Sequence, residues 1–232
     1  MDNRLSTIQN TQMQSEQENS NKIKQQGLLP LFYHDDLQVC ISVVNALYEG
    51  GVKVIEFTNR GEHALENFKA LAKERDNSMK DLMLCAGTIK TPEHAAKFID
   101  AGADVLISPV FDSSVYDVAY MQKILWIPGC MTPTEIHQSE KAGCNLIKLF
   151  PGDLLKPSFV EAIKPLFQKI DFVVTGGVDT SKENITAWFK AGVCGVGMGS
   201  KLITKDILKN KEYGLITAKA KELLKIIEEI QA

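Results

Sequence analysis

Short apolar runs alternate with amphipathic stretches along most of the chain. Each run has the length of a β-strand, and the stretches between runs repeat apolar positions with the roughly 3.6-residue period of a helix. The eight runs lie at residues 28–33, 53–58, 82–87, 104–108, 125–128, 146–150, 171–175 and 194–198. Because no linker interrupts the alternation, the pattern favours a closed (β/α)8 barrel, the TIM-barrel fold of the α/β class, over an open doubly wound sheet.

The N-terminal segment departs from this pattern. Residues 1–26 are rich in Gln, Asn and Ser and contain few apolar residues, so we expect a polar tail or a frayed helix that adds little to a core. Residues 27–232 are expected to form a single barrel domain that ends in a helix over about 206–230. That helix carries an apolar stripe at Leu215, Ile216, Leu223, Ile226, Ile227 and Ile230.

A repeated helix-to-strand junction marks equivalent positions from which residues can be counted along different strands. Four times a helix ends at a glycine that suits the left-handed closing position, and a strand follows at once. Glu56 lies five residues after the first of these glycines, and Lys148 lies five residues after the third. The two side chains are therefore predicted at one level on the second and sixth strands, which face each other across an eight-stranded barrel. The glycines are Gly51, Gly102, Gly143 and Gly192.

The second strand places polar residues on one of its faces. Side chains alternate along a strand, so Glu56, Thr58 and Arg60 point to the same side. The side that faces the helices must be apolar, so the polar set is predicted to face the barrel axis near the C-terminal mouth, where barrel active sites lie. The alternative is a structural ion pair of Glu56 with an arginine or lysine that only caps the core.

Lys148 interrupts an otherwise apolar strand. A lysine at a strand end can extend its charged head to solvent, but Lys148 lies before the mouth, which makes this alternative less favourable. Burial favours the neutral, nucleophilic form of an amine, whereas a neighbouring carboxylate favours the ammonium form. The two influences oppose each other at a Glu–Lys pair.

Three further segments carry candidate binding groups. Thr88 ends the third strand, where its hydroxyl could hold a substrate carboxylate or bond the following turn. Glycine-containing loops follow the seventh and eighth strands, where barrels often bind phosphate through backbone N–H groups, although tight turns also use glycine. The candidate phosphate-binding residues are Gly176, Gly177, Gly199 and Ser200.

Two helix starts have a structural explanation. Thr132 with Glu135, and Thr180 with Glu183, fit capping boxes, in which a hydroxyl and a carboxylate bond the free amides of the first turn. We assign no chemistry to either pair.

Composition narrows the function classes. The chain is 44% hydrophobic and 24% charged with a net charge of −3, which gives no reason to expect nucleic-acid or membrane partners. No apolar run approaches the roughly 20 residues of a membrane span, and no signal peptide is recognisable, so a cytoplasmic location is expected. The five cysteines form no CxxC pair and the four histidines are scattered, so the sequence supports neither a metal nor another cofactor.

The motifs together resemble a known family. In order, they are GGVKVIEFTNRG, CAGTI, LISP, IPGCMTPTE, IKLFPGD, TGGV and GMGS. This series is similar to the 2-keto-3-deoxy-6-phosphogluconate (KDPG) and 4-hydroxy-2-oxoglutarate (KHG) aldolase family over about residues 28–230. The resemblance implies a class I aldolase barrel, a homotrimer, that uses a lysine Schiff base and no metal.

The resemblance also implies residue roles. Lys148 falls on the Schiff-base lysine and Glu56 on the proton-transferring glutamate, while Arg60 and Thr88 fall on ligands of the pyruvyl carboxylate. The four loop residues named above fall on the phosphate-binding backbone. The implied reaction cleaves a keto acid: KDPG to pyruvate and glyceraldehyde 3-phosphate, and KHG to pyruvate and glyoxylate.

The chain departs from the family pattern at two places that concern binding. Gly152 stands where many members have alanine, a change expected to loosen the turn after the lysine strand. The segment 32–36 lacks the basic residue that some members carry after the first strand, which weakens the expected preference for phosphate. Alternatives are therefore an aldolase for the galactonate analogue or for an unphosphorylated keto acid, a phosphosugar-binding barrel without catalysis, and a purely structural oligomer.

Overall fold

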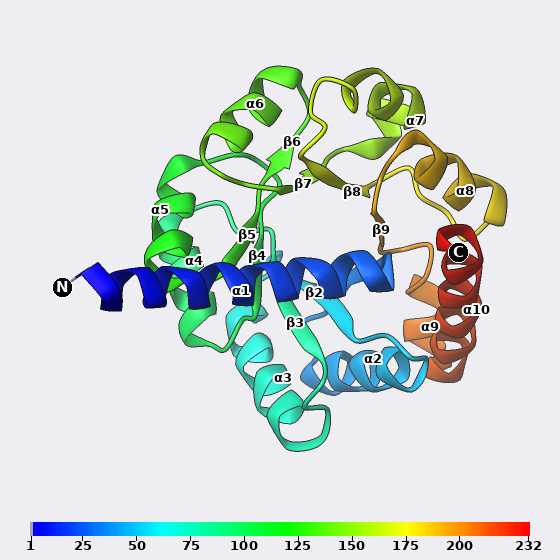
Figure 1. The fold of residues 1–232 in the computed structure, drawn as a ribbon. Helices are drawn as coiled ribbons and strands as arrows, with labels where there is room; N and C mark the ends of the chain where they lie inside the picture. Colours follow the sequence, from blue (N-terminus) through cyan, green and yellow to red (C-terminus); the bar gives the residue numbers. More distant parts are fainter. Residues whose placement is uncertain (1) are drawn as a thin grey trace.

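Parallel strands form a nearly closed barrel surrounded by helices (Figure 1). The computed structural model describes the backbone of residues 2–232 and the side chains of residues 14–232. The strands are β1 (Leu28–Phe32), β2 (Val54–Thr58), β3 (Met83–Gly87), β4 (Val105–Ile107), β5 (Leu125–Ile127), β6 (Gly129–Cys130), β7 (Leu146–Leu149), β8 (Asp171–Thr175) and β9 (Gly195–Met198). Their order is β5-β4-β3-β2-β1-β9-β8-β7-β6, and every pairing is parallel. The predicted TIM-barrel fold is confirmed.

The predicted fifth strand is divided into two. β5 pairs with β4 and β6 pairs with β7, and only Pro128 separates the two pieces. Proline has no N–H to donate to a sheet ladder, which explains a break at this position. The Pro128 carbonyl instead accepts the Lys148 N–H at 2.9 Å. β5 and β6 therefore form the two edges of the sheet, and Pro128 joins them.

Helices cover the outside of the barrel, except for the first. They are α1 (Asp2–Gln26), α2 (Leu37–Glu49), α3 (Ala64–Ser78), α4 (Pro92–Asp100), α5 (Ser113–Gln122), α6 (Pro133–Lys141), α7 (Gly152–Ile163), α8 (Lys182–Ala191), α9 (Lys205–Asn210) and α10 (Tyr213–Gln231). The single terminal helix expected over 206–230 is wrong: Lys211 adopts a left-handed φ of 56° and separates α9 from α10. The capping box at Thr132 is confirmed, whereas Ser181 rather than Thr180 caps α8.

The four glycine junctions adopt the predicted geometry. Each glycine has a positive φ, in the region that closes a helix and turns the chain into the next strand. The values are 93° for Gly51, 94° for Gly102, 89° for Gly143 and 109° for Gly192. The glycines from which Glu56 and Lys148 are counted are therefore equivalent positions in the backbone.

The core has two parts that lie on opposite faces of the strands. Ile55 and Phe57 belong to the outer cluster between strands and helices, and both side chains are fully buried. Val54, Met83 and other inward side chains form a smaller cluster inside the barrel. The alternation predicted along the second strand is thus realised.

α1 lies across one end of the barrel (Figure 1). Ile23 near its C-terminal end is 2% exposed and packs on the inner cluster. The Gln26 side chain accepts hydrogen bonds from Lys53 N at 2.5 Å and Val54 N at 3.0 Å, and donates to the Val54 carbonyl at 2.9 Å. The last turns of the segment expected as a polar tail therefore cover the N-terminal end of the strands. Met1 of that segment lies outside the described residues.

Within residues 2–232, no helix is both long and apolar enough to cross a membrane.

Candidate active site

A buried acid and a buried amine meet inside the barrel. Lys148 Nζ donates a hydrogen bond to Glu56 Oε1 at 3.2 Å. Glu56 is 0% exposed and Lys148 is 3% exposed, so neither charge reaches bulk solvent. The predicted convergence of the two side chains from β2 and β7 is confirmed, and the alternative in which Lys148 extends to solvent is wrong.

Strand pairing fixes the lysine from both sides. Lys148 pairs in register with Gly129 on β6 and with Val173 on β8. Its N–H bond to the Pro128 carbonyl adds a main-chain anchor at the same level. The amine is therefore carried by a rigid part of the sheet rather than by a loop.

A glycine makes the space that Glu56 occupies. A Cβ at Gly87, at the end of β3, would lie 2.6 Å from Glu56 Cγ and 2.7 Å from Cδ. Glu56 Oε2 is buried and has no hydrogen-bond partner among the described residues. One carboxylate oxygen thus binds the amine, and the other is available for proton transfer to a bound molecule.

The inner cluster also contains a thiol, which is not a competing nucleophile. Cys85 pairs in register with Glu56 and is fully buried. Burial, reinforced by the nearby Asp104 and Glu56 carboxylates, raises the pKa of Cys85 well above its usual value. The thiolate that nucleophilic attack requires is therefore disfavoured at neutral pH.

Arg60 and Thr88 lie together where β2 and β3 end. Arg60 Nε donates a hydrogen bond to Thr88 Oγ1 at 3.4 Å. Thr88 has a φ of 60°, which is unusual for a β-branched residue. The pair places a guanidinium and a hydroxyl side by side at the mouth, and both groups can donate hydrogen bonds to a carboxylate.

Both glycine-containing loops line one cavity of about 380 Å³. Gly176 and Gly177 have φ values of 92° and 68°, so their loop adopts a backbone conformation that favours glycine. Gly199 and Ser200 line the cavity from the loop after β9, and Arg60 also lines it. The structure therefore brings the four predicted phosphate-binding residues together with Arg60.

Phe150 connects this cavity to the buried pair. Phe150 lines the cavity, and the centroid of its ring lies 5.7 Å from Lys148 Nζ. Glu56, Lys148 and Thr88 do not themselves line the cavity. The amine thus lies behind the cavity wall, on the inner side of Phe150.

Three polar side chains that line the cavity were missed by the sequence reasoning. Thr175 Oγ1 is buried without a hydrogen-bond partner among the described residues. Asp179 and Lys201 add opposite charges to the cavity. The alternation along β8, which turns Val173 into the barrel, would have predicted the inward direction of Thr175, whereas the two charged residues lie in loops without such a signal.

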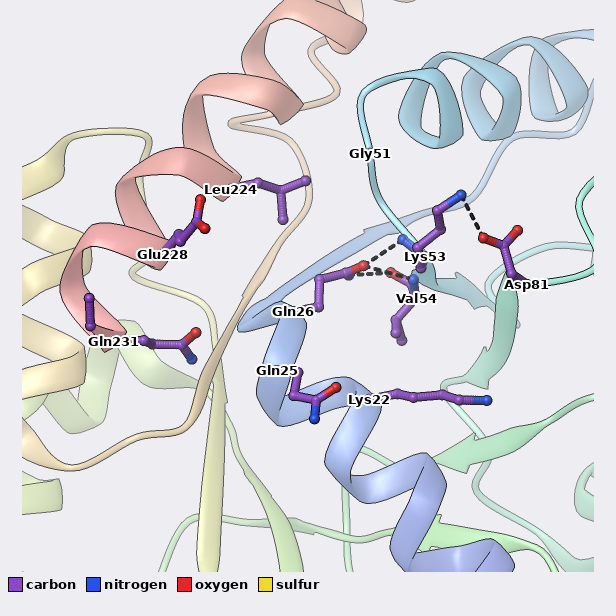
Figure 2. A pocket seen from close by; sticks show the side chains of 11 residues that line it. Lys22, Gln25, Gln26, Gly51, Lys53, Val54, Asp81, Leu224, Glu228 and Gln231 are labelled. Atoms are coloured by element: carbon purple, nitrogen blue, oxygen red, sulfur yellow. Dashed lines mark hydrogen bonds and ion pairs between the residues drawn. The ribbon is translucent and has the colours of Figure 1, made fainter.

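A larger cavity of about 700 Å³, seen from close by in Figure 2, lies where the strands begin, beside the C-terminal turns of α1. Lys22 and Gln26 of α1 line it together with Glu228 of α10. Figure 2 shows Lys53 joined to Asp81, at 2.8 Å, on one side of this cavity. None of the predicted site residues lines it, so it is separate from the candidate active site.

Comparisons with known proteins identify the family of the chain. The sequence matches the family described as KDPG and KHG aldolase over residues 19–219. The 2-dehydro-3-deoxy-phosphogluconate aldolase of Dickeya dadantii is 32% identical over 196 residues, which make up 84% of this chain and 89% of that protein. The KHG/KDPG aldolase of Escherichia coli K12 is 30% identical over the same shares.

A solved structure is similar over most of its length. It is the KDPG aldolase from Legionella pneumophila with pyruvate captured at low pH as a covalent carbinolamine intermediate. It is 26% identical to this chain, has a TM-score of 0.78, and the match covers 84% of this chain and 92% of the other.

The fold and these relatives define the protein as an aldolase, an enzyme of the lyase class. The chain belongs to the KDPG and KHG aldolase family.

Proposed function

We propose that this chain is a class I aldolase that cleaves KDPG to pyruvate and glyceraldehyde 3-phosphate. We propose that it also cleaves 4-hydroxy-2-oxoglutarate to pyruvate and glyoxylate. The observation that carries the proposal is the Lys148–Glu56 pair, which is buried and bonded at 3.2 Å. A site that only binds a phosphosugar needs no buried amine, so the pair argues against a barrel without catalysis.

The first steps form the Schiff base. Glu56 Oε1 is placed to take a proton from the Lys148 ammonium, which leaves a neutral amine. The amine adds to the C2 carbonyl of the keto acid to give a carbinolamine. Glu56 then returns its proton to the departing C2 hydroxyl, so loss of water gives an iminium and leaves Glu56 as a carboxylate. The carbinolamine captured in the Legionella pneumophila aldolase supports this route.

The next steps cleave the carbon skeleton. Glu56 takes the proton of the C4 hydroxyl, directly or through a water, and the C3–C4 bond breaks. The electrons of that bond move to the iminium nitrogen, so C4 leaves as an aldehyde and an enamine of pyruvate stays on Lys148. Glu56 returns a proton to C3, and hydrolysis frees pyruvate and the amine.

The remaining residues hold the two ends of the substrate. Arg60 offers a planar, two-pronged donor set to the keto-acid carboxylate, with Thr88 beside it at 3.4 Å. The N–H groups of the two glycine-containing loops receive the phosphate of the aldehyde half.

A second candidate is an aldolase for the galactonate analogue or for an unphosphorylated keto acid. Asp179 lines the cavity and partly offsets the positive charge of Arg60 and Lys201. A 2-dehydro-3-deoxy-6-phosphogalactonate aldolase of Escherichia coli is 28% identical over 160 residues, 68% of this chain and 76% of that protein. Turnover rates on the gluconate, galactonate and unphosphorylated substrates, measured side by side, decide among these possibilities.

Trapping of the Schiff base tests the mechanism. Borohydride added with pyruvate should leave a reduced pyruvyl adduct on Lys148, detected by mass spectrometry of peptides. Lys148→Ala should abolish the adduct, whereas Lys164→Ala, at a partly buried lysine that bonds the Ile170 carbonyl, should retain it. An adduct on another lysine, or none with the unmodified protein, overturns the scheme.

We also propose that the protein is a homotrimer in the cytoplasm, as the family resemblance implies. Sedimentation velocity measures the first point, because a trimer has three times the mass of a chain of 25.7 kDa.

A further inference from the structure

The first turn of α7 lies directly against the loop that follows β8. A Cβ at Gly152 would lie 2.5 Å from Val174 Cγ2 and closer still to the Gly176 carbonyl oxygen. From the other side, a Cβ at Gly177 would lie 2.7 Å from Asp153 Cα and 2.8 Å from Asp153 N. Real Cβ atoms essentially never come within 3.0 Å of such neighbours. In this chain the two segments therefore lie too close together at both glycines to leave room for a Cβ.

The loop is also held from its far side. Asn184 Nδ2 and Trp188 Nε1, both on α8, donate to the Gly177 carbonyl at 3.2 and 3.5 Å. Asn184 Oδ1 accepts the N–H of Asp179 at 3.1 Å. The loop is thus fixed between α7 and α8, and an added atom on the α7 side strains these bonds.

The position of this loop affects only one part of the site. Gly176 and Gly177 line the cavity together with Arg60. Lys148 is held separately, by its register with Gly129 and Val173. A displacement of the loop therefore changes the outer wall of the cavity and leaves the amine in place.

We propose that Gly152 is a positioning residue that sets the binding of the aldehyde half of the substrate. Through its contact with Gly176 it brings the N–H groups of the loop to the distance at which they receive the terminal phosphate. The turn was expected to be loosened by glycine at this position, but the glycine permits a closer contact instead. This inference rests on the proposed function and specifies which half of the substrate the residue serves.

The variant Gly152→Ala tests the proposal against a matched control, Gly214→Ala. A Cβ at Gly214 meets no heavy atom within 4 Å, so the control adds the same methyl group to open space on α10. Deuterium exchange at the pyruvate methyl group, followed by proton NMR in D2O, reports the half of the site that holds pyruvate, namely Lys148, Glu56 and the carboxylate-binding pair of Arg60 and Thr88. We expect this rate to stay within about twofold in Gly152→Ala, while KM for KDPG rises about tenfold or more.

The unphosphorylated substrate distinguishes an effect on phosphate binding by the loop from an effect on the rest of the site. KM for 4-hydroxy-2-oxoglutarate should change less than about threefold, because its aldehyde half carries no phosphate. In the control, Gly214→Ala, the exchange rate, KM for KDPG and KM for 4-hydroxy-2-oxoglutarate should all stay within about twofold of the unmodified protein. An unchanged KM for KDPG, or exchange that falls in the same proportion as cleavage, overturns the proposal.

Two further measurements keep the test independent of folding and of catalysis. Asn184→Ala releases the same loop from α8. It should therefore also raise KM for KDPG while leaving the rate of pyruvate exchange nearly unchanged. If both values change together, or neither changes, the proposal is overturned. Calorimetric titration with inorganic phosphate should give an affinity for Gly152→Ala about fivefold or more below that of Gly214→Ala, and equal affinities refute it. Absence of exchange and cleavage in the unmodified protein would instead refute the proposed function, while the phosphate titration still tests the loop.

Discussion

Replacement of Lys148 by methionine separates the electrostatic role of the buried pair from its chemistry. Methionine keeps an unbranched apolar side chain but removes the charge, so Glu56, at 0% exposure, loses its cation. Two unit charges at the observed 3.2 Å attract by about 5 kcal/mol at an effective dielectric constant of about 20. Removal of one partner of a buried pair typically costs about 3–5 kcal/mol, because the remaining charge stays desolvated.

We therefore expect Lys148→Met to lower the free energy of unfolding by about 3 kcal/mol or more. The double variant Lys148→Met with Glu56→Gln removes the orphan charge and should recover at least half of that loss. Urea unfolding followed by the fluorescence of Trp126 and Trp188, both buried, measures the three variants and the unmodified protein. A loss below about 1 kcal/mol, or a double variant less stable than Lys148→Met, would refute the conclusion that the pair is desolvated.

Three further outcomes follow from the site and its surroundings. Gly87→Ala places a Cβ 2.6 Å from Glu56 Cγ, so pyruvate trapping measured by mass spectrometry should fall about tenfold or more. Gly214→Ala should trap pyruvate normally. Equal trapping by the two variants would contradict the conclusion that Gly87 leaves the space that Glu56 occupies. Thr175→Val removes a buried hydroxyl that has no partner among the described residues, so urea unfolding should show a gain of about 1 kcal/mol, and a loss would reveal a missing partner. Burial raises the pKa of the Cys130 thiol from 9.0 to about 11, so it should react with Ellman's reagent at pH 8 only after unfolding. Its contribution to stability is complete below pH 9 and is lost as the pH rises toward 11, which urea midpoints across that range would show.

The level of the buried pair was predictable because glycine constrains the backbone at known places. Gly51 and Gly143 both adopt left-handed φ values, 93° and 89°, so each starts a strand from an equivalent point. Side-chain alternation then determines which residues face inward, and it placed Glu56 and Lys148 correctly. Local rules were sufficient here because the distances involved are only five residues long.

Other features depend on contacts between distant parts of the chain and could not be predicted from local patterns. Ile23 is an isolated apolar residue in a polar segment, and only the folded barrel shows that it packs on the inner cluster. The side chain of Gln26 forms hydrogen bonds with the main chain at the start of β2, a contact that the periodicity of apolar residues does not predict. Pro128 was visible in the sequence, but its division of the fifth strand follows from the different partners on either side. The tight contact of Gly152 likewise depends on the loop after β8, more than 20 residues further along.

The covering of the barrel by α1 also has a consequence for the order of events. Among the residues that the structure describes, Ile23 and the inner cluster fill the barrel on the α1 side of Glu56 and Lys148, so the inner cluster closes that side to a ligand held by the amine. In the proposed reaction, the aldehyde half lies nearer the mouth, against the two glycine-containing loops. Because pyruvate stays bonded to Lys148 as an enamine after the aldehyde has formed, the aldehyde departs first and pyruvate last, and product inhibition by pyruvate and by the aldehyde should differ accordingly.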